Sequence, residues 1–172
     1  MEIEILNWIQ MLRTPWLDTI VPMVSSLGNM GWIWIVLAIG LMLFPKKRKT
    51  GVIMIMALVI DAILCNVIIK NLVCRVRPFH VNTAIELLIP EPGEFSFPSG
   101  HTAVSFAAVA ALYFAGEKRL FLPALVLAVM IALTRLYLYV HYPTDVLGGI
   151  LIGLLSGYLA GKVGEKLLKK GH

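Results

Sequence analysis

The pair His141 and Asp145 has the spacing of a catalytic imidazole and a carboxylate that orients it. Residues four apart lie one helical turn from each other, so the Asp145 carboxylate can accept the Nδ1 hydrogen of His141. The other ring nitrogen, Nε2, then keeps its lone pair and can act as a nucleophile. Pro143 suits a first helical turn, which places His141 at the mouth of a helix. A local pair of polar groups that merely satisfy each other is the alternative.

The tetrapeptide Pro98-Ser99-Gly100-His101 opens an apolar run and has the form of a helix start that binds an anion. Pro98 fixes the approach of the chain, and Ser99 is a candidate N-cap. Gly100 lets a ligand come close to the backbone, where free N–H groups and the helix dipole attract negative charge. An ordinary capped helix start is the alternative.

Three cations, Lys70, Arg77 and Arg135, lie at or near the ends of apolar runs, where an unpaired charge is costly. Lys70 and Arg77 are seven residues apart, about two helical turns, so they are predicted to share a helix face. Asn66 joins that face one turn earlier. Taken singly, each cation could instead snorkel to the lipid headgroups.

The elements that carry these residues have the composition of a membrane protein. Of the 172 residues, 59% are hydrophobic and 15% are charged, and the mean hydropathy is +0.84. This composition excludes a disordered chain and argues against a water-soluble globule, so the apolar excess must face lipid.

Apolar runs predict an all-α bundle of six transmembrane helices, preceded by an amphipathic helix over 1–13 that lies in the membrane interface. The runs are 16–27, 30–44, 51–74, 102–116, 120–139 and 142–161. The run 16–27 is too short to cross a core of about 30 Å unaided, so it must tilt, re-enter or thin the bilayer. Residues 1–172 are expected to form one membrane-embedded domain with a long polar loop at 75–100.

Basic residues in the short breaks between apolar runs predict the orientation of the chain in the membrane. The breaks 46–49 and 118–119 and the tail 162–170 hold ten Lys and Arg residues. Alternating crossings put all three on one side, which the positive-inside rule makes cytoplasmic. Loop 75–100 and the candidate site then lie on the extracytoplasmic side, and the C-terminus is cytoplasmic. The formal charge of +5 therefore reports topology, and no nucleic-acid partner is expected.

Together the three patterns resemble the signature of the type 2 phosphatidic acid phosphatase superfamily, also called the lipid phosphate phosphatases. That signature reads KxxxxxxRP, PSGH and SRxxxxxHxxxD. The stretches 70–78, 98–101 and 135–145 match its parts, with Thr134 in place of the usual serine. The small size of the chain is similar to that of bacterial undecaprenyl-diphosphate phosphatases.

The resemblance implies a role for each site residue. Nε2 of His141 would attack phosphorus to form a phosphohistidine, with Asp145 holding the ring, and His101 would protonate the leaving oxygen and then activate water. The phosphoryl oxygens would be held by Lys70, Arg77, Ser99, Gly100 and Arg135. It also implies metal independence and no cofactor. His101, His141 and Asp145 would suffice as ligands of a catalytic zinc ion, but three neighbouring cations would repel it.

The expected reaction is removal of the terminal phosphate from a membrane lipid phosphate or diphosphate, with undecaprenyl diphosphate as the first substrate. Phosphatidylglycerol phosphate, phosphatidic acid and diacylglycerol diphosphate are the alternatives. A vanadium haloperoxidase resembles the family in its anion-binding residues, but six lipid-facing runs argue against it. An anionic-lipid transporter would not need the pair His141 and Asp145.

Other features have structural interpretations. Asp61, nine residues from Lys70, is predicted on the opposite helix side, in a structural role, with a functional role of this intramembrane carboxylate as the alternative. Arg75, off the Lys70 face, is expected to anchor at the membrane interface. Glycines recur every four residues in the last run and predict close helix packing or a homodimer: Gly149, Gly153, Gly157 and Gly161. Four loop residues either gate the site or select the headgroup: His80, Glu86, Glu91 and Glu94.

Overall fold

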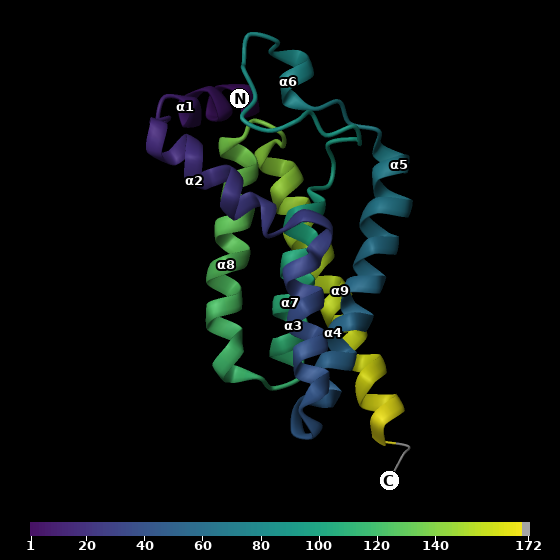
Figure 1. Ribbon diagram of the computed structural model, residues 1–172. Helices are drawn as coiled ribbons and strands as arrows, with labels where there is room; N and C mark the ends of the chain where they lie inside the picture. The colour runs from purple at the N-terminus through teal and green to yellow at the C-terminus, as the bar shows by residue number, and fades with distance from the viewer. Residues whose placement is uncertain (170–172) are drawn as a thin grey trace.

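The computed structural model describes residues 1–169, with side chains described to residue 166; Lys170 of the predicted basic tail lies outside them. This part of the chain contains helices and no strand, which confirms the all-α prediction (Figure 1). The elements are α1 (Glu2–Gln10), α2 (Pro15–Ser26), η1 (Asn29–Gly31), α3 (Trp32–Leu43), η2 (Pro45–Lys47), α4 (Arg48–Asp61), η3 (Ala62–Ile69), α5 (Lys70–Val73), α6 (Pro78–Val81), α7 (Gly100–Phe114), α8 (Lys118–Tyr137) and α9 (Pro143–Lys169).

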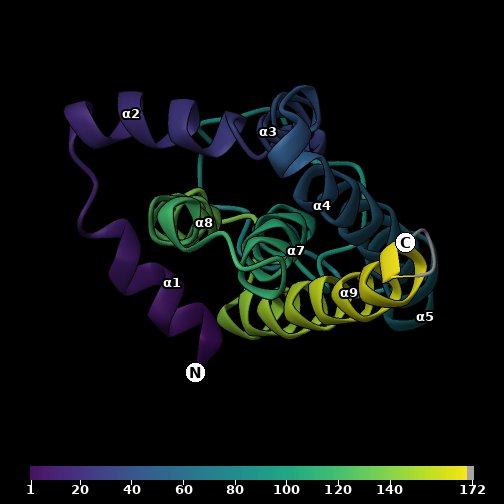
Figure 2. The same ribbon diagram turned by 90° about the horizontal axis from the view of Figure 1, so that it is seen from below.

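Helix α7 is the centre of the bundle. Figure 2, which looks along the bundle, shows α3, α4, α8 and α9 around it. Its small side chains let these neighbours approach closely, and five alanines of α7 are buried: Ala103, Ala107, Ala108, Ala110 and Ala111. Because α7 begins at Gly100, the central helix carries Gly100 and His101 at its N-terminal end.

The glycines that recur every four residues in α9, from Gly149 to Gly161, face α7. A Cβ atom added to Gly153 would lie 2.3 Å from the carbonyl oxygen of Ala103, and one added to Gly157 would lie 2.3 Å from the Cβ of Ala110. The prediction of close helix packing is therefore confirmed, and the packing partner is α7 of the same chain. A second copy would have to displace α7 to use these glycines, so the homodimer remains a prediction that needs another face.

Replacing Gly153 by alanine should destabilise the bundle by about 1–3 kcal/mol, because the new methyl group meets backbone atoms that cannot rotate away. The matched control is Gly40→Ala in α3, where a Cβ meets nothing within 4 Å. That change should be neutral or stabilising by up to about 1 kcal/mol, since alanine favours the helix. Thermal unfolding in detergent compares the two variants, and equal midpoints would contradict the packing described here.

The number of membrane spans differs from the prediction. Among the described residues, three helical stretches are long and apolar enough to cross a membrane: Pro45–Val81, Lys118–Tyr137 and Pro143–Lys166. Helices α2 and α3 reach that length only as a pair bent by 43°, and α7 is shorter, with 15 residues. The structure thus has three such spans, or four with the bent pair, and the six-span count is not confirmed. The bend arises because Met30 and Gly31 have φ values of 48° and 69°, which interrupt the helix.

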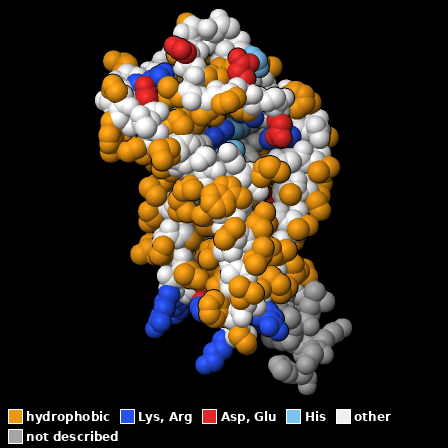
Figure 3. Space-filling view, viewed as in Figure 1, with side chains coloured by type: hydrophobic (Ala, Val, Ile, Leu, Met, Phe, Trp, Pro, Cys, Tyr) orange, Lys and Arg blue, Asp and Glu red, His pale blue; other side chains and the backbone are white. Residues whose placement is uncertain are grey.

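Hydrophobic side chains cover the flanks of the bundle (Figure 3). Exposed ones occur on α3, α4, α8 and α9, for example Val36, Val59, Leu133 and Leu151. This surface agrees with the predicted contact with lipid.

The two basic breaks lie at one end of the bundle, as predicted. Lys47 forms an ion pair with Glu117, and the Thr50 hydroxyl donates to Glu117 Oε1 at 3.3 Å. Lys and Arg side chains gather at this lower end in Figure 3.

Helix α1 confirms the helix predicted over 1–13, with shorter bounds, and lies beside the bundle at its other end. Leu6 is fully buried in a cluster with Phe79 and Tyr139. The Tyr139 hydroxyl donates to Asn7 Oδ1 at 2.7 Å, and Gln10 Nε2 donates to the Tyr137 carbonyl at 2.8 Å. Ile5, Trp8 and Leu12 remain exposed on the opposite side.

Candidate functional site

A cavity of about 880 Å³ opens at the end of the bundle opposite the basic breaks. In Figure 3 it is the hollow in the upper part of the molecule, with cationic and histidine side chains inside. Six of the predicted site residues line it: Lys70, Arg77, Gly100, His101, Arg135 and His141. Ser99 and Asp145 lie behind the cavity wall and are fully buried. The structure therefore brings together residues that are up to 75 positions apart in the chain, from Lys70 to Asp145.

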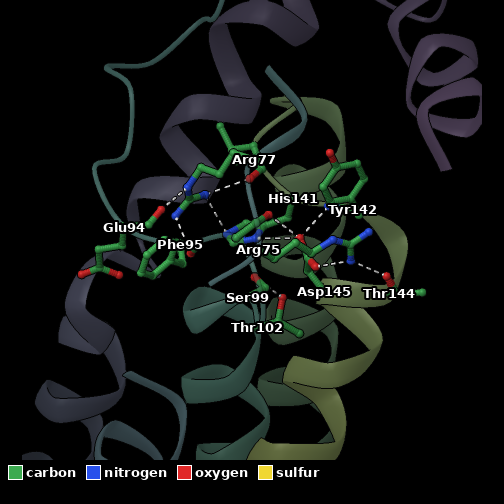
Figure 4. A network of polar contacts seen from close by, with 12 residues as sticks. Arg75, Arg77, Glu94, Phe95, Ser99, Thr102, His141, Tyr142, Thr144 and Asp145 are labelled. Carbon is green, nitrogen blue, oxygen red and sulfur yellow. Dashed lines mark hydrogen bonds and ion pairs between the residues drawn. The ribbon is translucent and has the colours of Figure 1, made fainter. Parts of the chain in front are cut away.

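His141 lies in the turn between α8 and α9 and is 2% exposed. Its Nε2 lies 3.3 Å from Nη1 of Arg77, and its Nδ1 lies 3.5 Å from Oδ2 of Asp145 (Figure 4). A guanidinium group only donates hydrogen bonds, so Nε2 of His141 carries the lone pair that accepts from Arg77. The hydrogen of the neutral ring then lies on Nδ1 and points toward Asp145. The second distance is too long for a strong hydrogen bond, and Nδ1 has no other partner in the described chain. Burial lowers the pKa of His141 well below its ordinary value, so the ring is neutral at neutral pH.

The Asp145 carboxylate is held on both oxygens. Oδ2 accepts from the Ser96 hydroxyl at 2.5 Å and from the backbone N–H of Tyr142 at 2.9 Å. Oδ1 accepts from Nη1 of Arg75 at 2.6 Å. With its carboxylate fixed, Asp145 can orient the His141 ring.

The expectation that Arg75 anchors at the membrane interface is wrong, because Arg75 reaches Asp145. Helix α5 ends at Val73, and Cys74 turns the chain with φ 49°, so Arg75 no longer follows the face geometry of the helix. Pro78 is the signal in the sequence, since a proline disfavours helical geometry in the residue before it. The partner Ser96 has no such signal.

The guanidinium groups of Arg77 and Arg135 are both buried. Arg77 donates to the carbonyls of Glu94, Val140 and Phe95, at 2.7, 2.8 and 3.4 Å. Arg135 donates to the Ser25 hydroxyl at 2.5 Å, and its Nε has no partner among the described residues.

Neither guanidinium forms an ion pair with an Asp or Glu of the part of the chain that the structure describes. A buried charge is costly unless it is paired, so these two groups fit an anion in the cavity.

Lys70 differs from the two arginines because it already has an anionic partner. Its Nζ forms an ion pair with Glu94 of the polar loop, and this contact holds the pKa of Glu94 below its ordinary value. Lys70 is buried, whereas the Glu94 side chain is 68% exposed. Glu94 is the one predicted loop carboxylate that lines the main cavity; Glu86 and Glu91 line a separate cavity of about 480 Å³ with His80.

Glu94→Gln should lower KM several-fold, because the substrate phosphate no longer competes with a carboxylate for Lys70. Glu94 stays ionised as pH falls to its lowered pKa, so the effect should be the same at about pH 6 and about pH 8. Steady-state phosphate release and the inhibition constant of orthovanadate measure it. The control is Glu91→Gln, and an equal shift in both variants would contradict a specific competition at Lys70.

His101, the second residue of α7, contacts Asn29 of η1. Its Nε2 lies 2.9 Å from Asn29 Oδ1, and a Cβ added to Gly28 would lie 2.9 Å from its Cδ2. The bend between α2 and α3 therefore supports the His101 ring. Gly28 and Asn29 lie between the predicted apolar runs 16–27 and 30–44, and no pattern in the sequence indicates their contact with His101.

Ser99 takes the N-cap position of α7, but its side chain does not cap the helix. Its hydroxyl accepts from the Thr102 hydroxyl at 2.9 Å, and its N–H donates to the Asp145 carbonyl at 3.0 Å. A Cβ on the next residue, Gly100, would lie 3.3 Å from Asn66 Oδ1 and 3.8 Å from Lys70 Nζ. Gly100 thus leaves space beside these polar groups.

Two geometric predictions about the third apolar run are wrong. Asp61 lines the same cavity as Lys70 and not the opposite side. Nine residues make two and a half α-helical turns, but Ala62–Ile69 is a π-helix, which takes more residues per turn and changes the phase. The prediction that Lys70 and Arg77 share a helix face is also wrong, because α5 ends at Val73, before Arg77. Both residues nevertheless line the cavity. Asp61 is 1% exposed, and its Oδ1 has no partner within residues 1–169.

Within the described residues, no three His, Cys, Asp or Glu side chains lie where they could hold a metal ion. The cavity instead collects cations, the rings of His101 and His141, and backbone at one helix start. This arrangement can bind a tetrahedral anion and attack it with Nε2 of His141.

Comparisons with known proteins agree with this geometry. The family described as the PAP2 superfamily matches residues 50–168. The chain is similar to an undecaprenyl-diphosphatase of Sulfolobus acidocaldarius, with 28% identity over 92% of this chain and 76% of the relative. It is similar to phosphatidylglycerophosphatase B of Bacillus subtilis, with 32% identity over 91% of this chain and 80% of the relative. The crystal structure of a PAP2-type phosphatidylglycerolphosphate phosphatase from Bacillus subtilis superposes with a TM-score of 0.78 and 30% identity, covering 96% of this chain and 85% of that one.

Proposed function

Because the chain belongs to the PAP2 superfamily of lipid phosphatases, we propose that it hydrolyses the terminal phosphate of a membrane lipid phosphate or diphosphate through a phosphohistidine on His141. The single observation that carries this proposal is the convergence, on one cavity, of Nε2 of His141 with two buried guanidinium groups that form no ion pair among the described residues. A nucleophile beside buried positive charge is what phosphoryl transfer requires.

The proposed reaction has two steps. In the first, Nε2 of His141 attacks phosphorus, the bond to the leaving oxygen breaks, and His101 gives that oxygen a proton. In the second, His101 takes a proton from water, the water oxygen attacks phosphorus, and the bond to His141 breaks to release inorganic phosphate. Arg77, Arg135 and Lys70 oppose the charge on the transferring group, and Asp145 stabilises the charged ring.

The proposed substrate is a lipid whose headgroup enters the cavity while its chain stays in the bilayer. Apolar side chains from α3 and α4 also line the cavity, namely Ile35, Ile55, Leu58 and Val59. Undecaprenyl diphosphate is our first candidate, in line with the name of the archaeal relative. Phosphatidylglycerol phosphate is the second, in line with the name of the Bacillus subtilis phosphatase of known structure.

We further propose that residues 1–172 act as one membrane-embedded domain with the cavity on the extracytoplasmic side and the C-terminus in the cytoplasm. The basic residues at the opposite end of the bundle support this orientation. The proposal includes no metal and no other cofactor, because three cations at the cavity favour an anion over a divalent metal.

The test is phosphate release by the purified chain from a panel of lipid phosphates, with and without EDTA. We expect release from undecaprenyl diphosphate at an unchanged rate in EDTA. Loss of activity in EDTA that zinc restores would contradict the metal-independent mechanism. Binding of the lipids without release would instead favour the anionic-lipid transporter.

A further inference from the structure

Arg75 joins the N-terminal helix to the carboxylate beside His141. Its Nη1 donates to Asp145 Oδ1 at 2.6 Å, and its Nη2 donates to Glu2 Oε2 at 2.5 Å. The centre of its guanidinium group lies 3.9 Å above the ring of Tyr142. Figure 4 shows this side chain lying against Asp145 and Thr144, on the side away from Arg77. Nη1 of Arg75 also donates to the Thr144 hydroxyl at 2.6 Å. Arg75 is thus held by four groups, Asp145, Glu2, Thr144 and Tyr142, and does not itself line the cavity.

Glu2 is also fixed from both sides. Oε1 accepts from the backbone N–H of Thr144 at 3.1 Å and from its hydroxyl at 2.7 Å, within the first turn of α9. Burial raises the pKa of Glu2, but hydrogen bonds from Thr144 and Arg75 outweigh it and leave the pKa below its ordinary value. Glu2 is therefore anionic at neutral pH and orients the Arg75 guanidinium toward Asp145.

The orientation and the charge of the Asp145 carboxylate depend on the Arg75 guanidinium group. Asp145 is fully buried, and Arg75 is the only Arg or Lys that pairs with it among the described residues. Without Arg75, Oδ1 would keep no hydrogen-bond donor, and a buried unpaired carboxylate would rotate or take up a proton. Oδ2, which faces Nδ1 of His141, would keep its bonds from Ser96 and Tyr142, but rotation would displace it and protonation would weaken it as an acceptor.

We propose that Arg75 is a positioning residue for the reaction, held by Glu2 of α1 and acting through Asp145 on the ring of His141. Through Glu2, the N-terminal helix α1 then helps to orient the nucleophile His141. This inference rests on the proposed function, because it assigns a role to Arg75 only if His141 attacks phosphorus.

A purely structural role for Arg75 would be to tie α1 to the bundle. The chain offers a matched control for this alternative, because Asn7 of α1 is bonded to the Tyr139 hydroxyl and does not contact Asp145. Asn7→Ala should lower the thermal unfolding midpoint but leave kcat within about twofold.

The experiment compares kcat and KM for phosphate release by the full chain in lipid nanodiscs. Arg75→Gln should lower kcat about 10–100-fold with KM changed less than about twofold, and Arg75→Lys should restore part of the loss. Glu2→Gln, which keeps the size of the side chain, should lower kcat about 3–10-fold. In an Asp145→Asn background, Arg75→Gln should cost less than about threefold more, because both changes break one chain of contacts.

An unchanged kcat in Arg75→Gln would overturn the inference, and so would losses that simply multiply in the double variant. If Asn7→Ala lowers kcat as much as Arg75→Gln, Arg75 is a structural anchor only. His141→Ala separates the two proposals. Full activity in that variant would refute the proposed function, whereas its inactivity with a normal Arg75→Gln would refute only the role of Arg75.

Discussion

His141→Ala should lower kcat at least about 10⁴-fold, because removing a nucleophile leaves only the contribution of binding and of the cations. The variant should still fold, since Nδ1 of His141 makes no strong hydrogen bond and the ring lies at the edge of a cavity. Phosphate release measures the loss, and thermal unfolding in detergent measures folding.

The control for this variant is His80→Ala, which removes a loop histidine that does not line the main cavity. It should keep kcat within about threefold. Substantial turnover by folded His141→Ala protein would show that another group attacks phosphorus.

Arg135→Gln should lower kcat/KM about 10²–10³-fold, the range observed when one preorganised group is removed from a developing oxyanion. Arg135 is 3% exposed, has no countercharge among the described residues and presents an unpartnered Nε. Removing an uncompensated buried charge should leave stability unchanged or higher. Loss of activity without loss of stability is the signature of a residue kept to bind an anion.

Two further variants make the Arg135 result specific. Arg135→Lys keeps the charge but loses the planar fork, so it should be intermediate. Arg119→Gln, at the exposed basic end, should have no effect on kcat/KM. A stability loss in Arg135→Gln equal to its activity loss would contradict the role in anion binding.

The convergence of the predicted site was accessible from sequence because its residues sit at helix starts and ends. Pro98 and Gly100 mark the start of α7, and Pro143 marks the start of α9, so both histidines were placed at one end of the bundle. The expectation of one cavity for His101, His141 and the three cations agrees with the structure. Their roles in the reaction are proposals that the variants above test.

The helix faces on which Asp61 and Arg75 lie, and the number of membrane spans, could not be predicted from the sequence. The π-helix between Asp61 and Lys70 depends on packing in the bundle, and no α-helical period predicts it. The predicted role of Arg75 at the membrane interface assumes a continuous helix, but α5 ends at Val73, two residues earlier. The bend between α2 and α3 depends on the positive φ values of Met30 and Gly31. Because of this bend, the predicted spans 16–27 and 30–44 together form one bent pair of helices.

The most direct test is to identify the phosphorylated residue during turnover. His101→Asn protein lacks the group proposed to protonate the leaving oxygen and then to activate water. With a lipid diphosphate, whose phosphate leaving group needs little protonation, the second step should be slowed more than the first, so the variant should accumulate a phosphoenzyme when quenched rapidly. Peptide mass spectrometry under mildly basic conditions should place the phosphoryl group on His141. A phosphoryl group on any other residue would contradict the account, as would turnover with no phosphoenzyme in either His101→Asn or the unmodified chain.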